Sequence, residues 1–181
     1  MLLLSLFVCA SVTSALGPIE LYAKQLRSSP VLTKSATSAT VFALSDACAQ
    51  TLEGSWSLQR FAMTSAIGGC YFGPAAHFWY EALSRLVPRN SLPWVAFKAI
   101  LGQIFFGPLV TCAFFASACI QTQSSFPAKV KADLLDVQLT GLAYWPFVDM
   151  LCLSLIPVPY IPVAINLASF LWTIFLSLRS R

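Results

Sequence analysis

Long runs of residues without a charged side chain recur along the chain. Three of these runs lie at residues 61–80, 99–128 and 150–178. A helix of about 20 apolar residues is long enough to cross the hydrocarbon core of a bilayer. A membrane-spanning barrel would instead show segments of about ten residues with alternating polarity. The pattern therefore predicts an all-α integral membrane protein whose helices form a bundle.

The same pattern predicts four crossings, at residues 31–50, 61–86, 94–122 and 138–178. The last crossing is interrupted by prolines between residues 156 and 162, and if it forms two helices the count becomes five. We expect Pro74 to kink the second crossing and Gly107-Pro108 to break the third midway. Short amphipathic helices at 19–28 and 129–139 are typical of the membrane surface.

One membrane domain, residues 19–178, accounts for most of the chain. Residues 1–16 form an apolar run followed by small residues, which indicates a signal-like or targeting segment rather than a structural helix. Residues 179–181 form a short basic tail. With four crossings, eight Lys and Arg side chains fall on one side and three on the other. The positive-inside rule then places both termini on the same cytosol-like or matrix-like face.

Composition supports the membrane assignment and argues against several other classes. The chain is 57% hydrophobic and 10% charged, against about 25% charged residues in soluble domains. Its net charge of +4 is scattered, so we expect no nucleic-acid partner. The six cysteines are dispersed and the single His has no metal-binding companions, so we expect no metal site. Without a nucleophile–base set or a phosphate-binding loop, we expect neither enzymatic activity nor a cofactor.

A few polar side chains interrupt the predicted crossings. Asp46 and Gln50 are four residues apart and share one helix face. Ionisable groups at membrane depth are costly and face the bundle interior or a water-filled cavity. We therefore hypothesise a polar path through the bundle, formed by Asp46, Gln50, Lys98, Gln103 and Asp149. The alternative for Asp46 and Lys98 is that both reach the interface from helix ends.

The second crossing carries two further patterns. Gly69 and Gly73 form a small-xxx-small motif, which favours close helix packing. His77, Trp79 and Tyr80 form an aromatic cluster that suits a membrane interface. No partner for His77 can be named from the sequence, so we interpret it as an interfacial polar residue.

Several motifs follow one another in a distinctive order. They are Arg60, a Gly-Pro-x-x-His-x-Trp-Tyr segment (Pro74, His77, Trp79, Tyr80), a Trp-Pro pair followed eleven residues later by Ile-Pro (Trp145, Pro146, Pro157), and a closing Trp-x-x-x-Leu-Ser segment that begins at Trp172. In this respect the chain resembles the Mpv-seventeen family of peroxisomal and mitochondrial inner-membrane proteins. The resemblance extends over residues 19–178.

The resemblance implies a small four-helix protein of an organellar membrane, either mitochondrial inner or peroxisomal, with a plastid as a further option. It also implies channel-like permeability to small solutes, support of organelle homeostasis and no enzymatic site. The expected partners are membrane lipids, small solutes and a second copy of the chain. The alternative function is a membrane scaffold that binds lipids or other proteins.

The chain departs from the family pattern at a few polar positions. The family usually has Asp at the position of Gly102 and Gln at the position of Asp149. Other departures lie at Ile19, Gly141, Cys152 and Ile161. If these positions line a pore, the chemistry of that pore differs from that of a typical member.

Overall fold

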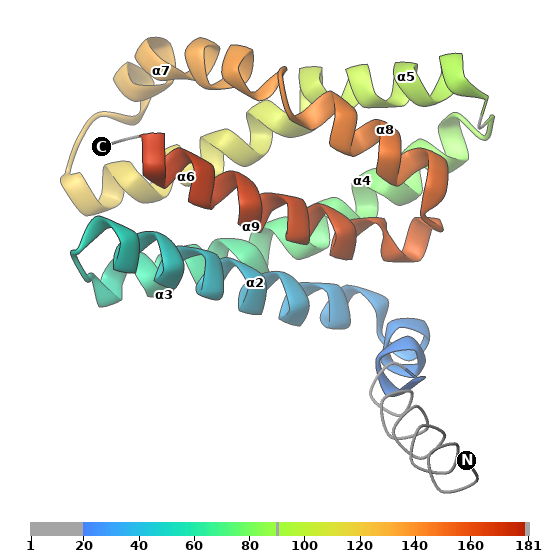
Figure 1. Cartoon of the computed structure of the whole chain (residues 1–181), viewed down its shortest axis with the longest axis horizontal. Coiled ribbons are helices and arrows are strands. Elements are labelled where there is room, and N and C mark those ends of the chain that lie inside the picture. Colours follow the sequence, from blue (N-terminus) through green and yellow to red (C-terminus); the bar gives the residue numbers. More distant parts are fainter. Residues whose placement is uncertain (1–19, 90, 180–181) are drawn as a thin grey trace, which may run out of the picture.

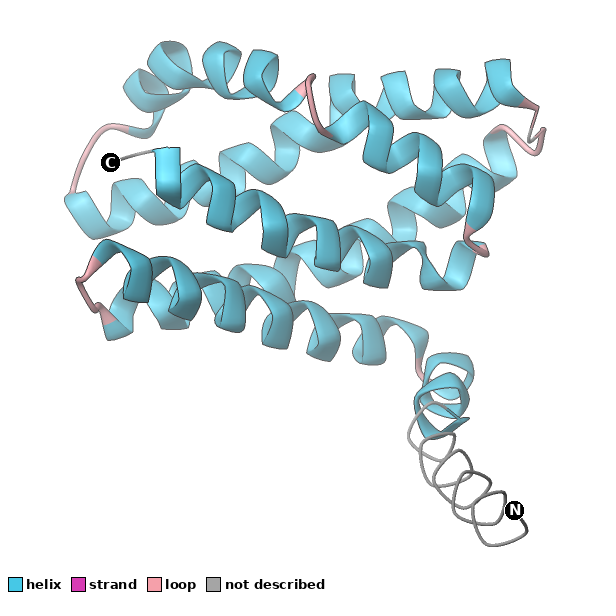
Figure 2. Ribbon diagram, in the orientation of Figure 1, coloured by secondary structure: helices cyan, strands magenta, loops and turns pink. Residues whose placement is uncertain are grey.

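Helices make up nearly all of the part of the chain that the structure describes. The computed structural model describes residues 20–89 and 91–179, and Figure 2 shows helices joined by short turns, with no strand drawn among these residues. The prediction of an all-α fold is confirmed for them. The predicted leader, residues 1–16, lies outside the described residues, as do the last two residues of the basic tail.

After a helical segment at 20–28, the elements alternate between α-helices and short segments of tighter or wider helix. In order they are α2 (Pro30–Glu53), α3 (Leu58–Ala66), η1 (Ile67–Phe72), α4 (Gly73–Leu86), α5 (Leu92–Leu101), η2 (Gly102–Phe106), α6 (Gly107–Thr122), α7 (Phe126–Gly141), α8 (Trp145–Leu155), η3 (Val158–Tyr160) and α9 (Ile161–Arg179).

The described elements run back and forth along the long axis in five passes (Figure 1). They are α2, then α3–η1–α4, then α5–η2–α6, then α7–α8, and finally η3–α9. The stretch 138–178 therefore belongs to two antiparallel passes, which is the second of the two alternatives that the sequence left open, because α9 turns back beside α8 and packs along α2. The physical reason lies at Pro157, since a proline pushes the residue before it out of the helical region. Ile156 is accordingly extended, with φ −109° and ψ 130°.

An odd number of passes puts the two ends of the described chain at opposite ends of the bundle. In Figure 1 the helical segment at 20–28 lies on the right, whereas the C-terminal end of α9 lies on the left. The prediction that both termini share one face counted α8 and α9 as one crossing, so with five passes it no longer follows from the charge count, and the topology in a membrane stays a prediction.

Two passes contain a widened turn near their middle. The Gly73 N–H bonds to the carbonyl of Gly68 and the Gly107 N–H bonds to that of Gly102, in each case five residues back. A proline follows each glycine, and its ring would clash with the carbonyl four residues back in a regular α-helix. The wide turn relieves that clash. The predicted break at Gly107-Pro108 is wrong, since the helix continues from Leu92 to Thr122.

Glycine allows the second pass to lie directly against α2. A Cβ on Gly73 would sit 2.5 Å from the Ser35 Cα, and one on Gly68 would sit 2.6 Å from the Ser38 carbonyl oxygen. At Gly69 the nearest atom is the Ala39 Cβ, at 3.1 Å. The small-xxx-small motif thus lies on the face that contacts α2.

Large apolar side chains cover much of the outer surface, Phe105, Leu109, Phe147 and Leu151 among them. By length and composition, one helix in the described part of the chain could cross a membrane, Leu92–Thr122, with 31 residues. Trp145–Leu155 and Val158–Trp172 are apolar but shorter. The number of membrane crossings stays a prediction.

Candidate functional site

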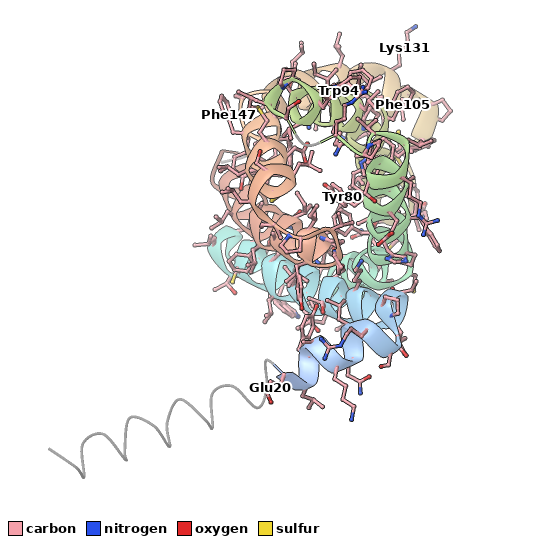
Figure 3. All side chains as sticks on the ribbon, turned by 90° about the vertical axis from the view of Figure 1, so that its right-hand side faces the viewer. Glu20, Tyr80, Trp94, Phe105, Lys131 and Phe147 are labelled. Atoms are coloured by element: carbon pink, nitrogen blue, oxygen red, sulfur yellow. The ribbon has the colours of Figure 1, made fainter. Side chains whose placement is uncertain are left out.

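A cavity of about 460 Å³ lies inside the bundle, and residues from all five passes line it. We call it the inner cavity. Figure 3 looks along the passes and shows Tyr80 directed to the inside, whereas Phe105, Phe147 and Lys131 point outward. Much of the wall is aromatic, formed by Phe42, Phe72, Phe106, Phe114, Phe115, Trp145 and Trp172.

Asp149 on α8 brings a carboxylate to this wall, with only 7% of its surface exposed. Its Oδ2 accepts a hydrogen bond from Gln103 Nε2 at 2.9 Å, and its Oδ1 accepts one from the Tyr80 hydroxyl at 3.3 Å. Gly102 lies opposite, where a Cβ would be 3.2 Å from Asp149 Oδ2. No Lys or Arg of the described part of the chain forms an ion pair with Asp149. Three passes therefore position one carboxylate that has no positive partner there.

Asp46 brings a second carboxylate to the wall, in a different environment. Its Oδ1 forms an ion pair with Arg60 Nε at 2.8 Å, and its Oδ2 accepts a hydrogen bond from Gln50 Nε2 at 2.5 Å. Arg60 also binds both carboxylate oxygens of Glu53, at 2.5 and 3.1 Å. The tight turn at Gly54, with φ 69°, brings α3 back against α2 and makes this network possible.

Ser45 adds a hydroxyl to the same wall. Its side chain is 2% exposed, lines the inner cavity and has no hydrogen-bond partner for its Oγ. Buried hydroxyls normally have a partner, so an orphan of this kind calls for an explanation. Either water or a bound molecule in the cavity would satisfy it.

A smaller cavity of about 300 Å³ lies between α4, α5 and the turn after α8. Lys98 and Ser84 line it, together with Tyr80. Tyr80 is the one described residue that lines both cavities, and it is 4% exposed.

The five residues predicted to form a polar path therefore fall into three groups. Asp46 joins Gln50, and Asp149 joins Gln103, whereas Lys98 lies apart in the smaller cavity. Gln50 is buried beside Asp46 but does not line the inner cavity. The alternative that Asp46 and Lys98 reach the interface does not hold for their side chains, because both are buried.

The structure places the residues of the predicted interfacial cluster in different surroundings. Tyr80 is a core residue bonded to Asp149, and Trp79 stacks on Phe106 with ring centroids 5.5 Å apart. His77 does have a partner, since its Nδ1 lies 2.9 Å from Nζ of Lys34, a side chain that is 1% exposed.

The sequence reading missed Lys34, Ser38, Ser45 and Asn166 as buried polar residues. The first three lie on α2, with Phe42, Asp46, Ala49 and Gln50, at spacings of three or four residues. That spacing is typical of one helix face, and it is the sequence pattern from which these three buried polar residues could have been predicted. No local pattern predicts the burial of Asn166, because its Nδ2 donates a hydrogen bond to the Ser38 hydroxyl, 128 residues away, at 2.9 Å.

The remaining motif residues shape the wall and the turns. The rings of Trp145 and Trp172 lie 6.0 Å apart, with Tyr144 stacked on Trp172. Pro146 stands in the first turn of α8, where a missing N–H costs no helical hydrogen bond. Pro157 begins the turn that reverses the chain into α9.

Comparison with known proteins gives consistent matches. Protein sym1 of Aspergillus oryzae is 32% identical over 163 residues, which cover 87% of this chain and 94% of that protein. Peroxisomal membrane protein PMP22 of Arabidopsis thaliana is 28% identical over 170 residues, 90% of each chain. Mitochondrial inner membrane protein Mpv17 of Caenorhabditis elegans is 26% identical over 159 residues, 85% of this chain and 88% of that protein. No solved structure gives a significant match.

A sequence model of the Mpv17 / PMP22 family matches residues 119–177, the region that contains Trp145, Pro146, Pro157 and Trp172. The similarity to sym1 extends the match over most of the chain. Relatives are named for the mitochondrial inner membrane and the peroxisomal membrane, which supports an organellar membrane location. The motif-based expectation is confirmed, and the chain belongs to the Mpv17 / PMP22 family.

Proposed function

We propose that the chain crosses an organellar membrane several times and offers small solutes a channel-like path through its two cavities. The observation that carries this proposal is that Tyr80 lines both cavities, so one side chain stands between them. Lipids contact the apolar outer surface, and solutes contact the polar groups inside. The path requires no catalytic group and no cofactor.

The lengths of the passes support several crossings. α2 has 24 residues, which is about 36 Å at 1.5 Å per residue. The hydrocarbon core is about 30 Å thick. α2 carries polar residues on the face buried in the bundle, and that is the orientation expected for a polar stripe in a membrane helix.

The polar groups inside are placed where a solute would lose water. Asp149 and Gln103 face the inner cavity, and Lys98 faces the smaller one. Hydrogen bonds to such groups offset the loss of hydration as a solute passes. In the proposed path the Tyr80 ring stands at the junction between the two cavities, and its hydroxyl is held by Asp149.

The proposal is tested by reconstituting the purified chain into planar bilayers and liposomes. We expect discrete conductance steps and solute efflux from the wild-type chain. Asp149→Leu should change selectivity or conductance, and Tyr80→Ala should increase flux by widening the junction. Asp136→Asn on α7, where the side chain is exposed, is the matched control and should behave as wild type.

Two outcomes would contradict the path. One is unchanged selectivity and conductance in folded Asp149→Leu. The other is a silent bilayer with protein shown to be inserted and folded. If a silent protein also co-purifies with a stoichiometric lipid or protein partner, the scaffold function replaces the path. Tyr80→Phe, which keeps the ring, serves if Tyr80→Ala does not fold.

A further inference from the structure

We propose that the inner cavity is a binding site for small organic amines, in which Asp149 holds the ammonium group and the aromatic wall holds an apolar body. The inference rests on the proposed function and deepens it by naming the class of solute that the cavity accepts. Four observations on the described residues lead to it.

The first observation is the incomplete coordination of Asp149. Each of its oxygens accepts one hydrogen bond, from Gln103 and from Tyr80. An ionised carboxylate has about four acceptor sites, so acceptor capacity remains. A buried charge without a partner is costly, whereas a charged donor beside it offsets that cost. A cationic donor is the ligand chemistry that this group lacks.

The second observation is the contrast with Asp46 on the same wall. Asp46 is paired with Arg60 and bonded to Gln50, so its charge is already offset. Arg60 is in turn engaged with Glu53. Among the residues of the wall, the one cation, Arg60, is therefore already paired, and the charged group left to recognise a ligand is the Asp149 carboxylate.

The third observation is the orphan hydroxyl of Ser45. It lines the cavity, it is 2% exposed and its Oγ has no hydrogen-bond partner. Ser45 lies on α2 and Asp149 on α8, so polar groups of two different passes face one space. A ligand with an ammonium group and a second polar atom could engage both.

The fourth observation is the aromatic lining. Phe106, Trp145 and Trp172 line the cavity, and aromatic rings attract cations as well as apolar groups. The volume of about 460 Å³ falls within the usual range for small-molecule sites, about 300–1,000 Å³. Together these features favour an amine with an apolar or aromatic body over a bare inorganic cation.

The test uses the full chain in nanodiscs and compares phenethylamine with 2-phenylethanol, which has the same body but no charge. Binding is measured by isothermal titration calorimetry against empty nanodiscs. We expect the amine to bind more tightly than the alcohol and phenylacetate not to bind. Asp149→Asn, which keeps the shape of the side chain, should weaken amine binding by more than about tenfold and leave the alcohol unchanged. Phenethylamine has no second polar atom for Ser45, so Ser45→Ala and the control Asp136→Asn should both leave amine binding unchanged.

Equal affinity for the amine and the alcohol would overturn the inference, as would wild-type amine affinity in folded Asp149→Asn. If that variant does not fold, the comparison of amine, alcohol and phenylacetate on the wild-type chain still decides. Efflux of an uncharged solute, erythritol, is recorded in parallel. Efflux without amine preference keeps the path and removes the inference, whereas amine binding without efflux keeps the site and removes the path.

Discussion

At the residue scale, the Asp149 carboxylate lies against Gly102, where the absence of a side chain leaves room for it. A Cβ on Gly102 would be 3.2 Å from Asp149 Oδ2. The resemblance noted in the sequence implies Asp at the position of Gly102 and Gln at that of Asp149. The two positions face each other, so relative to that expected pattern the carboxylate at the inner cavity lies on α8 and not on η2.

This relation predicts a coupling between the two positions. Gly102→Asp alone places a second carboxylate against the first, and we expect it to lower the free energy of unfolding by at least about 2 kcal/mol. Adding Asp149→Gln should recover much of that loss, giving a coupling energy of about 0.5–3 kcal/mol. Thermal unfolding in detergent measures it, with Asp149→Gln alone as the control. Strictly additive effects would contradict the coupling.

The sequence identified some of these residues and not others, for a physical reason. Asp149 could be identified because it interrupts a long apolar stretch. A charge in contact with lipid is costly, so its side chain was expected to face the interior of the bundle. Lys34 did not stand out, because a lysine near the start of a helix is expected to reach the interface. Its contact with His77 joins residues 43 positions apart. That contact follows from the packing of α2 on α4, which no local pattern encodes.

At the element scale, the contact between α2 and the second pass depends on individual glycines to different degrees. The Gly73 position is closed by the backbone of Ser35, which cannot move without shifting α2. The Gly69 position is bounded by the Ala39 Cβ at 3.1 Å and needs only a small adjustment. Both glycines lie on one motif, yet only at Gly73 would a Cβ clash with backbone, since the nearest backbone atom at Gly69, the Ser35 carbonyl oxygen, lies at 3.6 Å.

We therefore predict opposite outcomes for two alanine substitutions. Gly73→Ala should destabilise the protein by about 1–3 kcal/mol through overpacking. Gly69→Ala should be close to neutral, because alanine favours a helix by roughly 0.5–1 kcal/mol over glycine and this gain offsets a mild contact. Thermal unfolding of the two purified variants provides the comparison. An equal loss at both positions would show that the α2 contact is not as close as described.

Most element boundaries could be predicted from the sequence, because runs of uncharged residues and prolines mark them. The end of α2 at Glu53 and the start of α5 near Leu92 lie within a few residues of the predictions. The turn after α8 could not be settled in this way. A cluster of prolines is compatible with a kinked helix and with a reversal, and packing of α9 on α2 decides between them.

At the scale of the whole molecule, the number of passes determines which loops share a side. The turns after α2 and after α6 lie at the left end in Figure 1, and the connection between α4 and α5 lies at the right end. The C-terminal end of α9 is also on the left. The predicted charge asymmetry is weaker in this arrangement, because Arg179 joins the side of Arg60, Lys129 and Lys131.

We predict a corresponding pattern of chemical labelling in sealed vesicles. Cysteines introduced at Ser55 and Ser124, both exposed, should react with a membrane-impermeant maleimide from one side. A cysteine at Ser91 should react from the other side, and a C-terminal tag should be accessible with the first pair. The native chain supplies the background labelling. Accessibility of Ser91 and the C-terminal tag from the same side would contradict five crossings.

The overall plan of the bundle could be anticipated only in part. Composition and the family motifs indicate a helical membrane protein, and the part of the chain that the structure describes is helical. The inner cavity is a property of the assembled passes, since its wall combines side chains as distant as Phe42 and Trp172. No spacing along the chain specifies that arrangement.

The widened turns at Ile67–Phe72 and Gly102–Phe106 also fix the rotational phase of everything that follows them. Each carries one more residue than a regular turn, and one residue corresponds to about 100° of rotation in an α-helix. Removing one residue from the first segment would leave an ordinary helix of similar length. The face of α4 that bears Tyr80 would then point about 100° away from the inner cavity. The number of residues in the wide turn therefore determines whether the Tyr80 side chain points between the two cavities.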